Sequence, residues 1–199
     1  MVGKTQEDRR SERTRVLLRD ALLELMLEKR FDRITVQDII DRANVGRSTF
    51  YLHYQDKQDL VMRTFEQLFV MLRHQADASN DDGRIVYPTL ELFRHVKAQH
   101  RLYEALVWGR SVDLFFKAGQ QFLCQNIEEQ LAASLPAECK PQVPLPVVSS
   151  FVAGTLLTLL KWWLDNKMPY SPEQIDEIFQ QLVTPGVTAA LNLPSGGNL

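Results

Sequence analysis

The spacing of apolar residues constrains this chain more than any other feature, because almost everywhere it follows the period of an α-helix. Early in the chain, apolar residues recur three and four positions apart: Val16, Leu17, Ala21, Leu22, Leu25 and Met26. This spacing places them on one face of a helix. We find no run of alternating apolar and polar residues, and no Asn-Gly or Asp-Gly turn between such runs, which would signal strands and hairpins. The sequence therefore predicts an all-α protein.

Capping residues and chain breakers divide the chain into about nine predicted helices. Thr35 is an expected N-cap with Asp38 three residues later, as in a capping box. Asn44-Val45-Gly46 should end that helix, because Asn and Gly readily adopt the left-handed backbone conformation. The predicted helices span residues 7–29, 36–43, 47–54, 89–99, 102–108, 112–134, 146–165 and 172–191, with a long fourth helix running from Asp56 past Leu72. Polar residues 77–84 and proline-rich residues 136–146 are predicted loops, and residues 192–199 a tail.

Several classes of protein are disfavoured by the residues present. The chain contains no GxSxG, HExxH, P-loop or GxGxxG motif, so no enzyme, cofactor or metal site is predicted. Cys124 and Cys139 are too few for a disulfide scaffold, and the charged first thirty residues lack a secretory apolar region, so we expect a cytoplasmic protein associated with the nucleoid. Residues 145–164 are nearly long enough to span a bilayer. They include Pro146 and Lys161, however, so we expect a buried or dimer-forming helix and no membrane contact.

Two short helices joined by a tight Asn/Gly turn are typical of a helix-turn-helix motif. In this motif the second helix enters the major groove of DNA, and the first braces it across the sugar-phosphate backbone. The side chains able to reach DNA would be Arg47, Ser48, Thr49, Tyr51 and His53, whereas Ile39, Val45 and Phe50 would face inward. The spacing alone does not separate this motif from other helical hairpins.

A longer pattern extends over residues 10–72, and its defining positions are Thr35, Ile39, Ala43, Val45, Thr49, Phe50, Tyr51, His53, Tyr54, Lys57 and Leu60. With these residues at this spacing, the sequence resembles the TetR family of bacterial transcription regulators. The sequence departs from the family pattern at three positions: Ile40 replaces an alanine, Asn44 the turn glycine, and Gly46 the capping serine. Asn44 still tolerates left-handed dihedral angles, whereas Gly46 is the weaker cap.

The resemblance implies roles for particular residues of the motif. Thr35 and Lys57 would contact phosphate, with Tyr51 and His53 assisting on the DNA backbone. The residues expected to read bases are Arg47, Ser48 and Thr49, and Gln37 would reach either a base or a phosphate. Alternatives stay open at three of these positions: Thr35 as a plain N-cap, Tyr51 as a core aromatic residue, and Lys57 as a solvated charge.

The second half of the chain is predicted to provide dimerisation and ligand binding. Residues 146–165 are apolar around most of the helix circumference, so we expect a homodimer that pairs this helix and residues 172–191 with their copies. By resemblance, a small-molecule effector would contact aromatic residues of the bundle, with ordinary core packing as the alternative for each: Phe93, Tyr103, Trp108, Phe122 and Trp163. His95 or His100 would be a polar anchor.

These expectations combine into one functional hypothesis. Residues 1–56, extending to about 72 with the fourth helix, would form a helix-turn-helix DNA-binding domain. Residues 57–191 would form a ligand-binding and dimerisation domain, followed by the tail. The protein would be a repressor that binds a palindromic operator as a dimer and is released by a small-molecule effector. The alternative is a helical protein-interaction or effector-binding module without sequence-specific DNA binding.

Overall fold

A computed structural model describes residues 6–78, 88–108, 112–135 and 140–193, and in these ranges the regular structure is helical. The elements are α1 (Gln6–Glu28), η1 (Phe31–Arg33), α2 (Val36–Ala43), α3 (Arg47–His53), α4 (Lys57–Ala78), α5 (Thr89–Ala98), α6 (His100–Trp108), α7 (Val112–Ser134), α8 (Leu145–Asp165) and α9 (Pro172–Ala190). The predicted all-α fold class is therefore confirmed. The 3-10 turn η1 was not predicted, and α6 begins two residues earlier than expected, so that only Gln99 separates it from α5.

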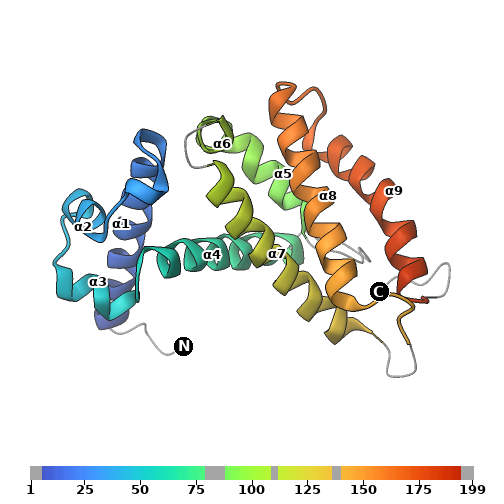
Figure 1. The fold of residues 1–199 in the computed structure, drawn as a ribbon, viewed down its shortest axis with the longest axis horizontal. Helices are drawn as coiled ribbons and strands as arrows, with labels where there is room; N and C mark the ends of the chain where they lie inside the picture. Colours follow the sequence, from blue (N-terminus) through green and yellow to red (C-terminus); the bar gives the residue numbers. More distant parts are fainter. Residues whose placement is uncertain (1–5, 79–87, 109–111, 136–139, 194–199) are drawn as a thin grey trace.

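The first three helices and η1 pack around a small apolar core, which we call the reading unit (residues 6–54). Its centre is formed by Leu18 and Leu22 of α1, Ile39 of α2 and Phe50 of α3, all of them fully buried. Leu60 at the start of α4 closes the same core. Figure 1 shows α2 and α3 on the outer side of α1, at one end of the molecule. The apolar spacing that predicted α1 thus corresponds to a real buried face.

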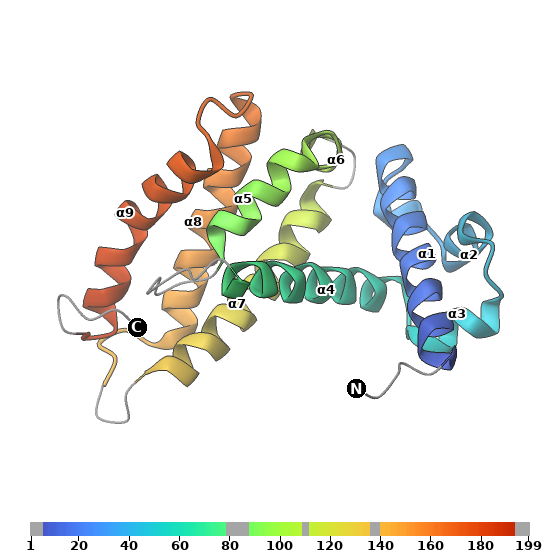
Figure 2. The same ribbon diagram turned by 180° about the vertical axis from the view of Figure 1, so that it is seen from behind.

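Helices α5 to α9 form a bundle around a second, larger core, and α4 connects this core to the first (Figures 1 and 2). Phe93, Trp163 and Phe179 are fully buried at its centre, where Phe93 and Trp163 meet edge to face with their ring centroids 5.4 Å apart. Buried hydrogen bonds join α5 to α9: the Thr89 hydroxyl donates to the Asp176 carboxylate and accepts from Gln180 Nε2 at 2.9 Å.

One of the described helices, α8, is long and apolar enough by composition to cross a membrane. Half of its most apolar window is buried inside the protein, however, and Val152, Leu156 and Trp163 lie in the bundle core. This burial is what a core helix of a globular bundle requires. Its remaining apolar residues lie on an exposed face that is described below.

Candidate nucleic-acid interface

The connection between α2 and α3 is built from residues whose local preferences match their positions. The Thr35 side chain accepts a hydrogen bond from the Asp38 N–H at 3.1 Å, and the Asp38 carboxylate accepts one from the Thr35 N–H at 2.7 Å. This capping box fixes the first turn of α2. Asn44 ends the helix with φ 52° and ψ 49°, in the left-handed region. Gly46 precedes α3 without a side-chain cap, as its lack of a side chain requires.

Three of the predicted DNA-contacting side chains meet on the exposed side of the motif. Arg47, in the first turn of α3, donates from Nη1 to Gln37 Oε1 of α2 at 3.5 Å. Its guanidinium carbon also lies 5.9 Å from the centre of the Tyr51 ring, one helical turn further along. Arg47 and Gln37 are exposed, and Tyr51 is 50% exposed, so this group combines charged, amide and phenol donors on one surface. The structure thus brings together residues of both helices of the motif.

The remaining predicted contacts on α3 differ in exposure. Ser48 is exposed, whereas Thr49 and His53 are half-buried. Burial and the nearby Arg15 charge lower the pKa of His53, so its ring is neutral at pH 7. Tyr54 is buried and packs against Phe50 at 5.8 Å between ring centroids, and it therefore belongs to the core.

Leu52 is an additional candidate that the sequence reasoning missed. It is 80% exposed, the highest value among the large hydrophobic side chains that the structure describes, whereas Phe50 of the same helix is fully buried. Leu52 follows Ser48 by four positions and therefore lies on the same side of α3. An apolar side chain at that place could contact a thymine methyl group. Its position four residues after Ser48 could have indicated from the sequence that Leu52 lies on the same face as a predicted DNA contact.

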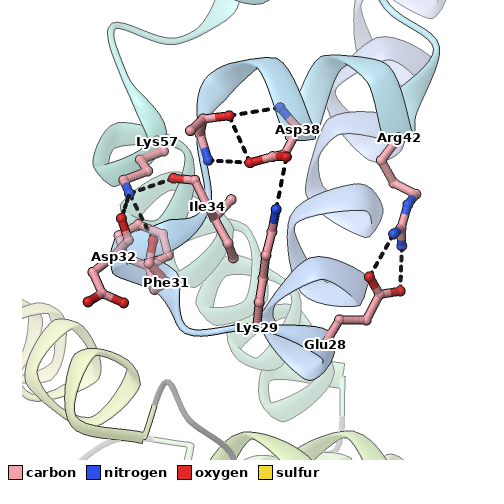
Figure 3. A network of polar contacts seen from close by, with 9 residues as sticks. Glu28, Lys29, Phe31, Asp32, Ile34, Asp38, Arg42 and Lys57 are labelled. Atoms are coloured by element: carbon pink, nitrogen blue, oxygen red, sulfur yellow. Dashed lines mark hydrogen bonds and ion pairs between the residues drawn. The ribbon is translucent and has the colours of Figure 1, made fainter.

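Behind this surface, ion pairs tie α2 to α1 (Figure 3). Lys29 Nζ lies 2.8 Å from Asp38 Oδ1, so the capping carboxylate also forms an ion pair with the residue that follows α1. Arg42 bonds Glu28 through both terminal nitrogens, at 3.0 and 2.8 Å, and also reaches Glu24. These pairs hold α2 at both of its ends, and α3 follows α2 after the three-residue turn Asn44-Val45-Gly46.

Lys57 has an unexpected environment at the start of α4. Its ammonium group donates to the carbonyl oxygens of Phe31 at 2.8 Å, Ile34 at 2.6 Å and Asp32 at 3.4 Å (Figure 3). It also lies 4.5 Å from the Phe31 ring centre. An ammonium has three donors, and here all three are directed to backbone oxygens. Lys57 thus connects α4 to the turn that precedes Thr35, and the phosphate contact expected for it stays a prediction.

Asp38 gives a pH-dependent prediction. The Lys29 ammonium, then the Thr35 N–H and hydroxyl, lower the pKa of Asp38 from 3.8 to about 2. Stability from this carboxylate is therefore complete above pH 4 and is lost as the pH falls toward 2. We expect Asp38→Asn to lower the free energy of unfolding by about 1 kcal/mol at pH 7, a modest value because the side chain is partly exposed. Urea denaturation at pH 7 and pH 3 measures this difference.

The matched control for that experiment is Lys29→Met, which removes the ion pair and leaves the capping box. It should cost less than Asp38→Asn at pH 7. A difference between wild type and Asp38→Asn that stays constant down to pH 2 would contradict the assignment.

The predicted effector residues divide into two groups. Phe93, Phe122 and Trp163 are buried in the bundle core, where Phe122 packs on Phe69 and Trp163 donates from Nε1 to the Tyr170 carbonyl at 3.0 Å. Tyr103 is also buried, but it lies on the wall of a cavity beside α1. The side chain of Trp108 lies outside the described residues. The packing favours a core role for the first group.

A second exposed surface is apolar and lies on α8 and α9. Val147, Phe151 and Trp162 recur along α8 with exposures of 56, 54 and 44%, and Leu182 of α9 is 66% exposed. A Cβ atom added at Gly154 or Gly186 would meet nothing within 4 Å, so both glycines leave the backbone open to close approach. We call this surface the α8–α9 face. Large exposed apolar surfaces commonly mark sites of interaction with other molecules.

An αL turn between two short helices, a second helix with exposed polar side chains, and a helical bundle behind them define a helix-turn-helix DNA-binding protein. Residues 18–64 match the family model of "Bacterial regulatory proteins, tetR family", and residues 88–185 match that of a "Transcriptional regulator C-terminal region". The chain belongs to the TetR family, which consists of DNA-binding transcriptional regulators and not of enzymes.

Individual relatives agree with this assignment. The uncharacterized HTH-type transcriptional regulator YxbF of Bacillus subtilis is 40% identical over an aligned length of 177 residues, and the alignment covers 84% of this chain and 44% of that protein. The chain thus spans less than half the length of this relative. A TetR transcriptional regulator from Streptococcus agalactiae has the same fold, with a TM-score of 0.58, 28% identity, and coverage of 89% of this chain and 97% of that one. NalD, the secondary repressor of the MexAB-OprM multidrug efflux pump in Pseudomonas aeruginosa, has a TM-score of 0.54 at 20% identity, covering 88% and 97%.

Proposed function

We propose that this protein is a homodimeric repressor that binds a palindromic operator in the cytoplasm and is released by a small molecule. The observation that carries the proposal is the exposed group of Arg47, Gln37 and Tyr51. It lies on a helix-turn-helix motif whose first helix is fixed at both ends by capping and ion pairs. A motif that is fixed before binding lowers the ordering cost of reading base edges.

Each proposed contact follows from its position in the motif. Arg47, Ser48 and Thr49 lie in the first turn of α3, where recognition helices of this motif contact bases. Gln37 extends this surface from α2. Thr35 is at the N-terminus of α2, where backbone N–H groups favour a phosphate. It caps the helix at the same end, so the proposed phosphate contact and the capping role are compatible. Tyr51 and His53 would contact the DNA backbone.

Lys57 is proposed to act on DNA by positioning. Its three carbonyl contacts hold η1 and the residue before Thr35, so they set where the N-terminus of α2 lies. Its positive charge remains close to that end of α2, and there it favours a phosphate.

The exposed α8–α9 face supports the same proposal, because it offers a surface for dimerisation. One recognition helix contacts few base pairs, whereas a two-fold dimer reads two half-sites about 34–36 Å apart. The α8–α9 face supplies an apolar surface with two open glycines, which suits the close packing of a four-helix interface. Such a dimer seated on an operator would exclude other proteins from the same stretch of duplex, and this is the physical basis proposed for repression.

Selection of bound duplexes from a random DNA pool tests the proposal directly. We expect an enriched palindrome whose half-site centres lie about one helical turn apart, or a multiple of it. Enrichment without symmetry would contradict the dimeric mode of reading. No enrichment at any salt concentration would contradict sequence-specific binding and would favour an interaction module.

A further inference from the structure

A cavity of about 670 Å³ lies between the reading unit and the bundle. α1 forms one wall, α4 forms the floor, and the α5–α6 corner forms the opposite wall, an arrangement that can be followed in Figure 2. The volume is within the usual range for sites that hold drug-sized ligands. The cavity is separate from the packed aromatic centre of the bundle, since Phe93 and Trp163 do not line it.

The walls of this cavity are mainly apolar. Leu23 and Met26 line it from α1, Phe65 and Met71 from α4, and Leu102 from α6. The charged residues among those lining it, Glu12, Arg19 and Asp20, are all on α1; Glu12 is exposed to solvent, and Arg19 is bonded to Asp20 at 2.8 Å. A charged group of a ligand placed against the α4 or α5–α6 wall would lose its hydration without gaining an ionic partner. The cavity therefore favours an uncharged, largely apolar molecule.

Two polar side chains on the α5–α6 wall could orient such a molecule. His95 is half-buried, and its ring meets the Tyr103 ring edge to face at 5.8 Å between centroids. Burial lowers the pKa of His95, so the imidazole is neutral at pH 7 and offers one donor and one acceptor. An apolar pocket with a few convergent polar groups is the usual form of a small-molecule site.

We propose that this cavity is a binding site for a neutral, amphiphilic small molecule, with its polar end at His95, and that its occupation lowers DNA affinity. The inference rests on the proposed function, and it places the effector beside α1 and not in the bundle core. α1 packs directly against α4 and α6 here and also carries the core of the reading unit. A molecule held between α1 and the α5–α6 corner would therefore change the position of the reading unit relative to the bundle and, in a dimer, the spacing of the two α3 helices.

The test uses the neutral naphthalene ketone dye prodan as the probe, with the full chain. We expect prodan emission to shift to the blue with one site per subunit. Leu23→Trp and Met71→Trp, which fill the cavity from the α1 wall and from the α4 floor, should weaken dye binding at least about tenfold. Leu27→Trp is the matched control, because Leu27 is exposed on α1 one turn beyond Leu23 and does not line the cavity. It should bind the dye as wild type does.

A second measurement separates the ligand site from the proposed function. Saturating prodan should lower the affinity of wild type and Leu27→Trp for the selected operator by about fivefold or more, the usual size of allosteric coupling. It should leave the operator affinity of Leu23→Trp unchanged. Failure to find any operator would refute the proposed function while the dye titration still reports on the cavity.

Three results would overturn the inference. Dye binding that both filling variants leave unaltered would place the dye elsewhere. Displaceable dye without an effect on operator affinity would refute the coupling. A change of oligomeric state in Leu23→Trp or Met71→Trp would identify the cavity as part of a contact between copies. Circular dichroism melts check that each variant is folded before these comparisons. If one of the two cavity-filling variants fails to fold, the other, on a different helix, still provides the test.

Discussion

Phe151→Glu is expected to convert the proposed dimer to a monomer at low micromolar concentration. Phe151 lies on the α8–α9 face, four residues after Val147, and its side chain is 54% exposed. In a two-fold interface both copies of the new carboxylate would be buried. Removing such a charge from water without a partner costs several kcal/mol, and about 1.4 kcal/mol corresponds to a tenfold change in the dissociation constant. We therefore expect the dimer to weaken by at least about a hundredfold.

Sedimentation velocity measures the change in mass, and operator affinity should fall in parallel. A monomer reads one half-site, so binding to the palindrome should drop by about a hundredfold or more toward the affinity for random DNA. Leu27→Glu is the matched control, because it places the same charge at an exposed leucine on α1. It should remain dimeric. A dimeric Phe151→Glu would show that the subunits pair through another surface.

The parts of this structure that could be predicted from sequence are those decided by neighbouring residues. The Thr35–Asp38 capping box depends on contacts between residues three apart, and the left-handed Asn44 on the backbone preference of asparagine itself. Helix bounds followed in the same way from the spacing of apolar residues, because the spacing reports directly which face is buried.

The parts that could not be predicted depend on residues far apart in the sequence. Lys57 bonds carbonyl groups 23 to 26 residues earlier, and nothing in its immediate neighbours indicates this. Tyr103 and Phe122 are both buried aromatic residues, but only the relative placement of α1, α4 and α6 puts Tyr103 beside a cavity and Phe122 inside a core. From the sequence alone, the five effector candidates are simply aromatic residues of the bundle. Their packing separates Tyr103, which lines the cavity, from Phe93, Phe122 and Trp163, which lie in the core.

Lys57 and Arg47 are expected to affect DNA binding in different ways, because Lys57 bonds backbone carbonyl groups whereas Arg47 is exposed on the surface of the motif. Lys57→Met would release η1 and the start of α2 from α4 and would remove the positive charge close to that end of α2. Both changes weaken contacts with phosphate, which every DNA sequence offers, so affinities for the operator and for random DNA should fall by a similar factor. This comparison measures backbone contacts separately from base reading.

Arg47→Ala is expected to lower operator affinity by about ten- to a hundredfold, with a much smaller loss on random duplex of the same length. The guanidinium is exposed, and its bond to Gln37 at 3.5 Å is long, so Arg47 is available for a two-pronged contact with guanine at little cost to the fold. A bidentate pair of this kind discriminates between bases by about 1–3 kcal/mol. Fluorescence anisotropy measures both affinities, and the salt concentration must be constant because the strength of phosphate contacts varies steeply with salt.

Arg47→Lys is the control variant, because it keeps the charge but loses the planar fork of the guanidinium. It should retain affinity for random DNA while losing most of the preference for the operator. Equal losses on both duplexes for Arg47→Ala would assign Arg47 to the phosphate backbone and leave base reading to Ser48, Thr49 and Leu52.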